Sequence, residues 1–100
     1  MVGLEIRVLL EKEKRKEFLH AFDILSKPQD KSDACVKKTL YENVAEDGRF
    51  IWVERWKDLK TLNNYMSSDH YRSLLGAIEV LGELVDMQVV EFKDLPKRIT

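Results

Sequence analysis

Residues 49–75 have the sequence RFIWVERWKDLKTLNNYMSSDHYRSLL, and the rest of the chain is arranged around them. The first eight residues suit a strand, whose side chains alternate between two faces. Trp52, Glu54 and Trp56 then share one face, so that an indole lies on each side of a carboxylate. Helical spacing begins after Asp58, a residue type that caps helix N-termini well. The stretch therefore predicts a strand with a tryptophan-rich face, followed by a helix that a polar break divides in two.

Three more strands and one more helix are predicted outside this stretch. Alternating apolar residues predict strands over residues 2–10, 34–44 and 83–92, and an apolar stripe at helical spacing predicts a helix over residues 12–26. Asp47-Gly48 is a strong hairpin signal, which makes the strands on either side of it antiparallel neighbours. The resulting order is the α+β, ferredoxin-like β-α-β-β-α-β arrangement, with a split second helix and a four-stranded antiparallel sheet.

Both faces of the predicted sheet carry apolar side chains, although one layer of helices covers only one face. Ile51 and Val53 lie opposite the tryptophans, and the last strand adds Val85, Met87 and Val89. A second apolar face needs a cover, and a second copy of the chain packed sheet to sheet would supply it. We therefore expect a homodimer.

The length and composition suit one small globular domain. With 100 residues, 44% of them hydrophobic and 35% charged, the chain is expected to form a single domain over residues 1–93 and a tail over residues 94–100. The 17 basic and 18 acidic residues give a net charge of −1, which provides no electrostatic case for binding nucleic acid or a membrane. Cys35 is the single cysteine, so an internal disulfide and a cysteine-rich metal site are excluded, and a reducing cytoplasm is the expected location.

The order of several short motifs resembles the antibiotic biosynthesis monooxygenase (ABM) domain family, of the dimeric α+β barrel superfamily. In that family a Gly-Cys precedes the second strand and a Glu-x-Trp ends the third. A Leu-x-x-His element follows on the next helix, and after a small residue comes a second histidine. Here the matching residues are Cys35, Glu54-Arg55-Trp56 and His70, and Glu5-Ile6-Arg7 of the first strand is similar as well. The resemblance covers nearly the whole chain, from the first strand to the fourth.

The resemblance implies both a fold and a function. Such domains form a dimeric α+β barrel, with a pocket in each subunit between the sheet and the helices. Characterised members oxidise electron-rich aromatics such as anthrones or quinols with O2, without a metal, flavin or haem, and other members degrade haem. We therefore expect a monooxygenase that needs no cofactor and acts on a small aromatic or quinol-like molecule.

The chain departs from the family pattern at several positions. Trp52 stands where the aromatic-oxidising members have a substrate-facing asparagine, and Leu62 stands where they have a tyrosine, while Trp56 is retained. Tyr65 replaces the first histidine of the helical element. The haem-degrading members have a histidine at the position of Leu75 and an asparagine on the first strand, and both are missing here, which argues against haem degradation.

Three residues are predicted to be catalytic: His70, Glu54 and Trp56. Imidazole titrates near neutrality, which makes His70 the best general base by residue type, although a histidine at a helix start can simply bond to the backbone. Glu54, buried beside aromatic rings, would accept a proton from a phenol, or it would be a structural carboxylate paired with Arg7 or Arg72. Trp56 would form a wall of the pocket, or it would seal the sheet against the helices.

Four residues are predicted to contact the substrate: Trp52, Tyr65, Tyr71 and Leu62. Trp52 would narrow the cavity or fill it, and the two tyrosines would hydrogen-bond a phenolic substrate or pack in the core. No metal ligand set is predicted. Two other functions stay open. A non-catalytic small-molecule binding or sensing dimer would retain a ligand without turnover, and a purely structural domain, filled by Trp52 and Trp56, would have no pocket.

Overall fold

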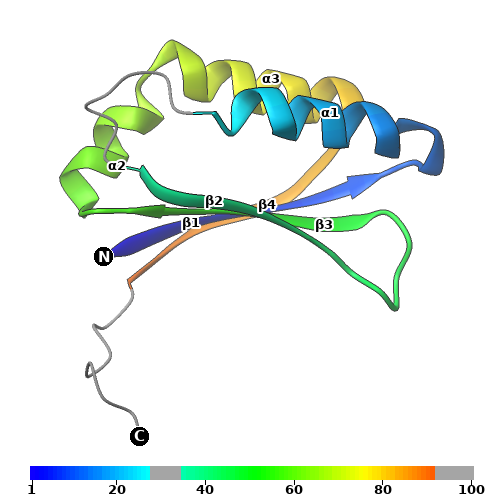
Figure 1. The fold of residues 1–100 in the computed structure, drawn as a ribbon, viewed down its shortest axis with the longest axis horizontal. Helices are drawn as coiled ribbons and strands as arrows, with labels where there is room; N and C mark the ends of the chain where they lie inside the picture. Colours follow the sequence, from blue (N-terminus) through cyan, green and yellow to red (C-terminus); the bar gives the residue numbers. More distant parts are fainter. Residues whose placement is uncertain (28–34, 92–100) are drawn as a thin grey trace, which may run out of the picture.

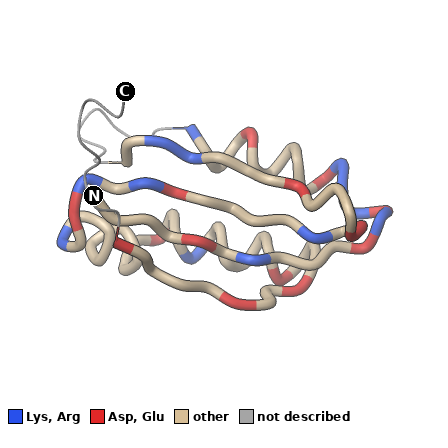
Figure 2. Tube along the Cα trace, turned by 90° about the horizontal axis from the view of Figure 1, so that it is seen from below, with Lys and Arg blue, Asp and Glu red and all other residues tan. Residues whose placement is uncertain are grey.

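The computed structural model describes residues 1–27 and 35–91, and its helices lie on one face of a four-stranded sheet (Figure 1). The strand order is β2-β3-β1-β4, with every neighbouring pair antiparallel. No helix of the described residues covers the opposite face (Figure 2). The predicted ferredoxin-like fold is confirmed. In chain order the elements are β1 (Val2–Leu10), the 3₁₀ helix η1 (Lys12–Lys14), α1 (Arg15–Leu25), β2 (Cys35–Glu42), β3 (Arg49–Trp56), α2 (Leu59–Met66), α3 (Asp69–Leu81) and β4 (Gly82–Glu91).

The predicted element boundaries are correct to within a few residues. The first helix starts with the 3₁₀ turn η1, and β2 ends at Glu42, before the predicted end of that strand at residue 44. The domain limit at residue 93, the tail and most of the loop predicted before β2 lie outside the described residues. None of the described helices has the length and hydropathy to span a membrane.

Side-chain caps set the starts of α2 and α3. The carboxylate of Asp58 accepts a hydrogen bond from the Thr61 backbone N–H at 2.9 Å, and the Thr61 hydroxyl accepts one from the Asp58 N–H at 3.4 Å. This reciprocal pair satisfies two N–H groups that a helix start leaves without a partner. The Ser68 hydroxyl accepts from the Tyr71 N–H at 3.2 Å and starts α3 in the same way. The polar break between the two helices thus fixes the direction in which Tyr71 projects.

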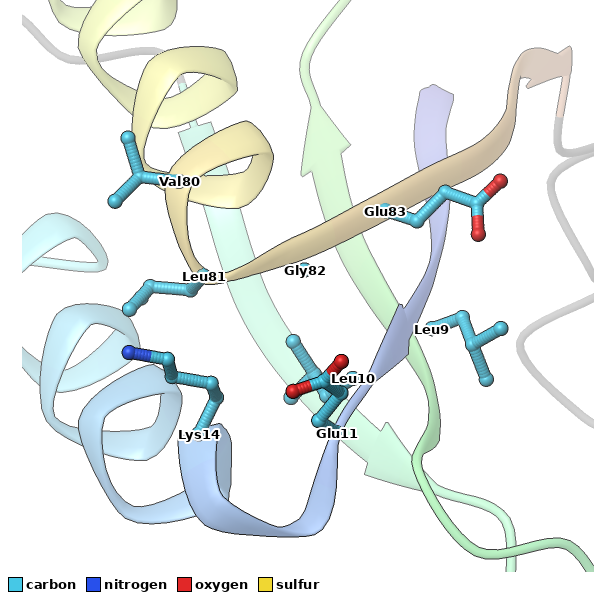
Figure 3. Close-up of a pocket in the computed structure, with 8 residues that line it drawn as sticks. All are labelled: Leu9, Leu10, Glu11, Lys14, Val80, Leu81, Gly82 and Glu83. Atoms are coloured by element: carbon cyan, nitrogen blue, oxygen red, sulfur yellow. The ribbon is translucent and has the colours of Figure 1, made fainter.

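Two glycines lie where the backbone passes close to the end of β1. Gly48 in the β2–β3 turn has φ of 81°, and a Cβ there would collide with the carbonyl oxygen of Leu10. Gly82 joins α3 to β4 in an extended conformation, and a Cβ at this position would collide with the Leu10 side chain and the Leu9 carbonyl (Figure 3). Both connections can therefore pack directly against β1.

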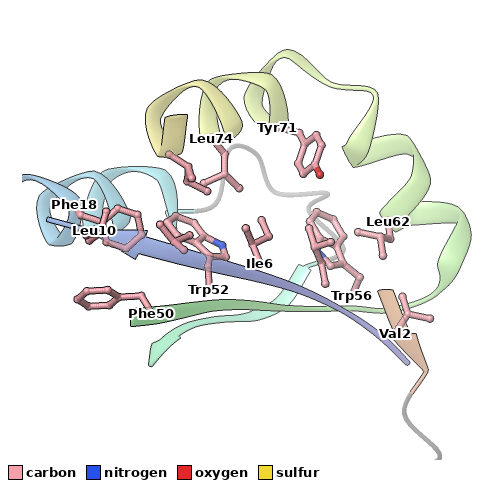
Figure 4. Packing of buried hydrophobic residues seen from close by; sticks show 13 residues of the cluster. Val2, Ile6, Leu10, Phe18, Phe50, Trp52, Trp56, Leu62, Tyr71 and Leu74 are labelled. Carbon is pink, nitrogen blue, oxygen red and sulfur yellow. The ribbon is translucent and has the colours of Figure 1, made fainter. Parts of the chain in front are cut away.

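The hydrophobic core lies between the sheet and the helices (Figure 4). The alternating residues of β1 and β3 that face the helices are buried, and α1, α2 and α3 add their apolar stripes, as predicted. Glu54 is the one charged residue among the buried residues of the described chain. The other members are Val2, Leu4, Ile6, Val8, Leu10, Phe18, Phe50, Trp52, Trp56, Leu62, Tyr71, Leu74 and Ile78.

A β-bulge at Val85 interrupts the pairing of β1 with β4. Arg7 pairs with Asp86, but the next residue, Val8, pairs with Leu84, so Val85 is the extra residue on β4. An extra residue of this kind reverses which face the following side chains occupy. The alternation of β4 can therefore not be counted through the bulge.

The bulge corrects the prediction that Val85, Met87 and Val89 share the helix-free face. Met87 pairs with Ile6 and Val89 with Leu4, and both partners belong to the core on the helix side. The expectation for Met87 and Val89 was wrong because a sequence pattern does not reveal the inserted residue. Val85 does lie on the helix-free face.

The helix-free face of the sheet is mixed in character. Ile51 and Val53 are half-buried there, as predicted, and a surface hollow of about 330 Å³ is lined by Ile51, Tyr41 and Val85 among others. Arg7 forms an ion pair with Asp86 at 3.2 Å at the centre of this face. A partner that covers the face would therefore meet apolar side chains around a polar centre.

Candidate functional site

The carboxylate of Glu54 lies at the centre of the tryptophan-rich face of β3 and is 0% exposed. Its Oε1 accepts a hydrogen bond from Trp56 Nε1 at 3.0 Å, and its Oε2 accepts one from Trp52 Nε1 at 2.8 Å. The Tyr65 hydroxyl on α2 donates to the same Oε2 at 3.2 Å. All three donors are neutral. A carboxylate buried in this way is costly unless hydrogen bonds replace its water, and these three do so.

The alternative that Glu54 pairs with an arginine is wrong. Arg7 projects from the helix-free face, where it pairs with Glu5 and Asp86. Arg72 pairs with Asp69 on the surface of α3. The partners of Glu54 come instead from positions two residues before and two residues after it on the same strand, and from α2.

The two tyrosines near this carboxylate have raised pKa values. Burial is the main cause for Tyr65, and the negative charge of Glu54 and the hydrogen bond to it add to the effect. Burial also raises the pKa of Tyr71, again with a contribution from the charge of Glu54. Both phenols therefore stay protonated at neutral pH, and Tyr65 acts as a donor to Glu54.

Aromatic rings lie in a layer above β3, in two groups that contain one tryptophan each. The rings of Trp56 and Tyr65 stack with centroids 4.4 Å apart, and Tyr65 meets Tyr71 edge-on at 5.4 Å. Trp52 packs edge-on against Phe22 of α1 at 4.7 Å. Trp52 and Trp56 are only 1% and 4% exposed. Both indoles are therefore packed into the layer between the sheet and the helices (Figure 4).

His70 bonds to the end of α1 and makes no hydrogen bond to Glu54. Its Nε2 lies 3.1 Å from the carbonyl oxygen of Leu25, and its ring centroid is 6.0 Å from that of Tyr65. A carbonyl oxygen can only accept, so Nε2 carries a hydrogen and Nδ1 holds the lone pair of the neutral ring. This is the backbone contact considered in the sequence analysis, and it leaves only Nδ1 to accept a proton.

The remaining candidates lie in the core. Leu62 is 0% exposed. The Tyr71 hydroxyl donates to the sulfur of Met87 at 2.7 Å rather than to Glu54. The structure thus gathers Trp52, Glu54, Trp56 and Tyr65 into one hydrogen-bonded group, with Tyr71 and His70 at its edge.

Lys38 joins this group although the sequence analysis did not identify it. It lies opposite Glu54 in the register of β2 with β3, so its side chain is on the face of the sheet that the helices cover. Its Nζ lies 5.4 Å from the centre of the Tyr65 ring and 3.5 Å from the Leu25 carbonyl oxygen. Counting back from the Asp47-Gly48 turn in steps of two would have placed it on this face. The irregular pairing lies beyond Lys38, between Cys35 and Lys37, and does not disturb that count.

A cavity of about 510 Å³ lies at the other end of α3, away from this group (Figure 3). None of the predicted site residues lines it, and its lining residues are Leu9, Leu10, Glu11, Lys14, Val80, Leu81, Gly82 and Glu83. Within residues 1–27 and 35–91, no three His, Cys, Asp or Glu side chains come together as a metal site.

The family model for antibiotic biosynthesis monooxygenase matches residues 1–75. The chain belongs to this family. The protein that carries the name "Putative monooxygenase YcnE", from Bacillus subtilis (strain 168), is 24% identical over 95 residues, which are 94% of this chain and 100% of YcnE. The family assignment agrees with the resemblance drawn from the motifs.

Solved structures share the fold of this chain at low sequence identity. An antibiotic biosynthesis monooxygenase family structure from Deinococcus radiodurans superposes with a TM-score of 0.83 at 14% identity, and each chain is covered in full. SnoaB, a cofactor-independent oxygenase from Streptomyces nogalater, superposes with a TM-score of 0.72 at 12% identity, with 97% of both chains covered. At such identities the likeness extends to the fold alone.

Proposed function

We propose that the protein is a cofactor-independent monooxygenase that oxidises a small aromatic or quinol-like molecule with O2, and that it acts as a homodimer. The main support is the buried Glu54 carboxylate, which three aromatic donors hold in place without a cation. Membership in a family of monooxygenases, with a cofactor-independent oxygenase among the structural neighbours, adds to this support.

The reaction balances without an added reductant. A hydroquinone and one O2 give a hydroxyquinone and one water, so the substrate supplies all four electrons. One oxygen atom forms the new C–O bond, and the other leaves as water with two protons. The protein has to hold the ring, remove a phenolic proton so that the anion can reduce O2, and return protons to the reduced oxygen.

The residues of the site suit these tasks as follows. Trp56 and Tyr65 form the aromatic wall, with Trp52 beside them, and Nδ1 of His70 accepts the substrate proton. Glu54 fixes the orientation of both indoles, and its charge favours a proton moving toward it through the Tyr65 hydroxyl. In this proposal Leu62 and Tyr71 shape the floor of the site from α2 and α3.

Oxygen uptake tests the proposal. Purified, metal-free protein is assayed with a panel of hydroquinones and anthrones, beside Trp56→Phe and His70→Ala. His20→Ala is the matched control, because His20 is exposed on α1. We expect uptake that depends on the protein, falls in the two site variants and is unchanged in the control. Folded protein that consumes no oxygen over the panel would refute the proposal.

A non-catalytic binding or sensing dimer is the second candidate. It is favoured by the packing of the site, because both indoles are buried and each indole N–H is taken up by Glu54. This alternative expects a ligand that copurifies or binds without oxygen uptake. Light scattering tests the homodimer common to both candidates, and a monomer at assay concentration would remove it.

A further inference from the structure

Lys38 places a positive charge on the helix-covered face of the sheet. Among the described strand residues, the others on this face are neutral or acidic. Lys38 is half-buried, and in residues 1–27 and 35–91 no carboxylate forms an ion pair with it. An ammonium group taken partly out of water usually finds an anionic partner, because its lost hydration has to be replaced.

The hydrogen bond that Lys38 makes is weak. Its Nζ is 3.5 Å from the carbonyl oxygen of Leu25, and the same oxygen already has a shorter contact with His70 Nε2, at 3.1 Å. An ammonium group has three donors, so most of the hydrogen-bonding capacity of Lys38 is unused by the described residues. The long, flexible side chain can therefore turn toward another acceptor at little cost.

The surroundings of the ammonium group suit an aromatic anion. The ring of Tyr65 lies below Nζ, 5.4 Å from it, and this ring belongs to the layer that contains Trp56. Lys38, Tyr65 and His70 are all partly exposed, unlike the two buried tryptophans, so of these five side chains they are the ones that contact solvent more.

We infer that Lys38 binds an anionic oxygen on an aromatic ligand that packs against Tyr65. The substrate class would then be acidic hydroxyaromatics, bound as anions, and the hydroxyquinone product of the proposed reaction would bind in the same way. This inference rests on the proposed function for the chemistry that follows binding, but binding itself can be tested without turnover. A charge-assisted hydrogen bond in a half-buried position is stronger than one in open water.

Calorimetry with two matched probes tests the inference. At pH 7.5, 2-hydroxy-1,4-naphthoquinone is an anion, whereas 2-methoxy-1,4-naphthoquinone is neutral and nearly the same shape. We expect the wild type to bind the hydroxy compound at least tenfold more tightly than the methoxy compound. Lys38→Met should abolish most of this preference and leave methoxy binding unchanged. Lys37→Met is the control, because Lys37 is exposed and lies opposite Arg55 in the β2–β3 register, on the face of the sheet without helices.

Several results would overturn the inference. These are a wild type that binds neither probe or shows no preference, a Lys38→Met protein that keeps the preference, and a variant that loses both probes equally. Circular dichroism checks that Lys38→Met folds. If it does not, Lys38→Arg must retain the preference and the preference must weaken with added NaCl, and failure of either overturns the inference.

Parallel oxygen uptake separates this inference from the proposed function. A protein that consumes oxygen with quinols but does not prefer the anionic probe loses only the role of Lys38. A protein that binds the anionic probe through Lys38 but never consumes oxygen loses only the oxygenase proposal.

Discussion

Replacement of Glu54 by glutamine is expected to destabilise the protein, because an amide cannot accept all three hydrogen bonds that the carboxylate accepts. Oε2 accepts from both Trp52 and Tyr65, whereas Oε1 accepts from Trp56 alone. The amide oxygen should therefore take the place of Oε2. The amide NH2 group then faces the indole N–H of Trp56, and two donors meet at a distance of about 3.0 Å.

The cost can be estimated from these contacts. A buried N–H that loses its acceptor costs about 1–3 kcal/mol, and losing the charge from the two remaining bonds costs about 1 kcal/mol more. We therefore expect Glu54→Gln to lower the free energy of unfolding by about 2–4 kcal/mol. Relief from burying a charge would reduce this figure, so the sign of the measured change is itself informative.

Urea unfolding followed by far-ultraviolet circular dichroism measures the change at pH 7, at one fixed protein concentration. Double variants test the assignment of the oxygens. Trp56→Phe removes the N–H that would face the amide, so its cost should be about 1–3 kcal/mol smaller in the Glu54→Gln protein than in the wild type. Trp52→Phe is the matched control and should show no such relief.

Two results would refute this reasoning. A Glu54→Gln protein within about 0.5 kcal/mol of the wild type would mean that the three hydrogen bonds stabilise the site by no more than the burial of the charge costs, contrary to the expected loss. The second result is a larger fall in the cost of Trp52→Phe than in the cost of Trp56→Phe when Glu54 is replaced by glutamine. It would mean that the amide turns the other way and that the two oxygens have been assigned wrongly.

Three other measurements follow from the structure. The raised pKa values of Tyr65 and Tyr71 mean that the folded state keeps protons that the unfolded state loses above about pH 10. The free energy of unfolding should therefore be full below that pH and fall above it by about 1.4 kcal/mol per pH unit for each tyrosine that stays protonated in the folded state. Tyr65→Phe should make this fall less steep in urea titrations, and an unchanged slope would contradict the expectation. Leu62→Ala should cost about 2–5 kcal/mol of unfolding free energy, because the side chain is fully buried, and a loss below about 1 kcal/mol would place Leu62 at an open cavity instead. Gly48→Ala should lower the melting temperature, because alanine disfavours φ of 81° and its Cβ would meet Leu10, and an unchanged melting temperature would count against this turn geometry.

The fold could be predicted because its signals are local. Alternation on β3, the Asp47-Gly48 turn and the polar break after Met66 each depend on a few neighbouring residues, and together they define the order of elements. The shared face of Trp52, Glu54 and Trp56 was correct for the same reason. Spacing within one strand is enough to bring these three side chains together.

The contacts that were missed depend on pairing between strands. The bulge at Val85 moved Met87 and Val89 to the other face, and the place of Lys38 opposite Glu54 follows from the pairing of β2 with β3. One inserted residue reverses the face of every residue beyond it, and the sequence pattern is almost the same with or without it. The partners of Glu54 were also missed, because a buried carboxylate is expected to seek a cation, whereas here indole and phenol donors replace one.

The separation of Lys38 from Glu54 gives the site its electrostatic character. The two residues occupy paired positions on neighbouring strands, where opposite charges commonly form an ion pair. Instead, Glu54 is held by neutral donors, while the ammonium group of Lys38 lies over the Tyr65 ring. The negative charge is thus held by the aromatic donors, and in residues 1–27 and 35–91 no carboxylate pairs with the positive charge beside Tyr65. Because a direct Lys38–Glu54 ion pair would cancel both charges, their separation leaves a negative charge among the aromatic donors and a positive charge beside Tyr65, as the proposed anion site requires.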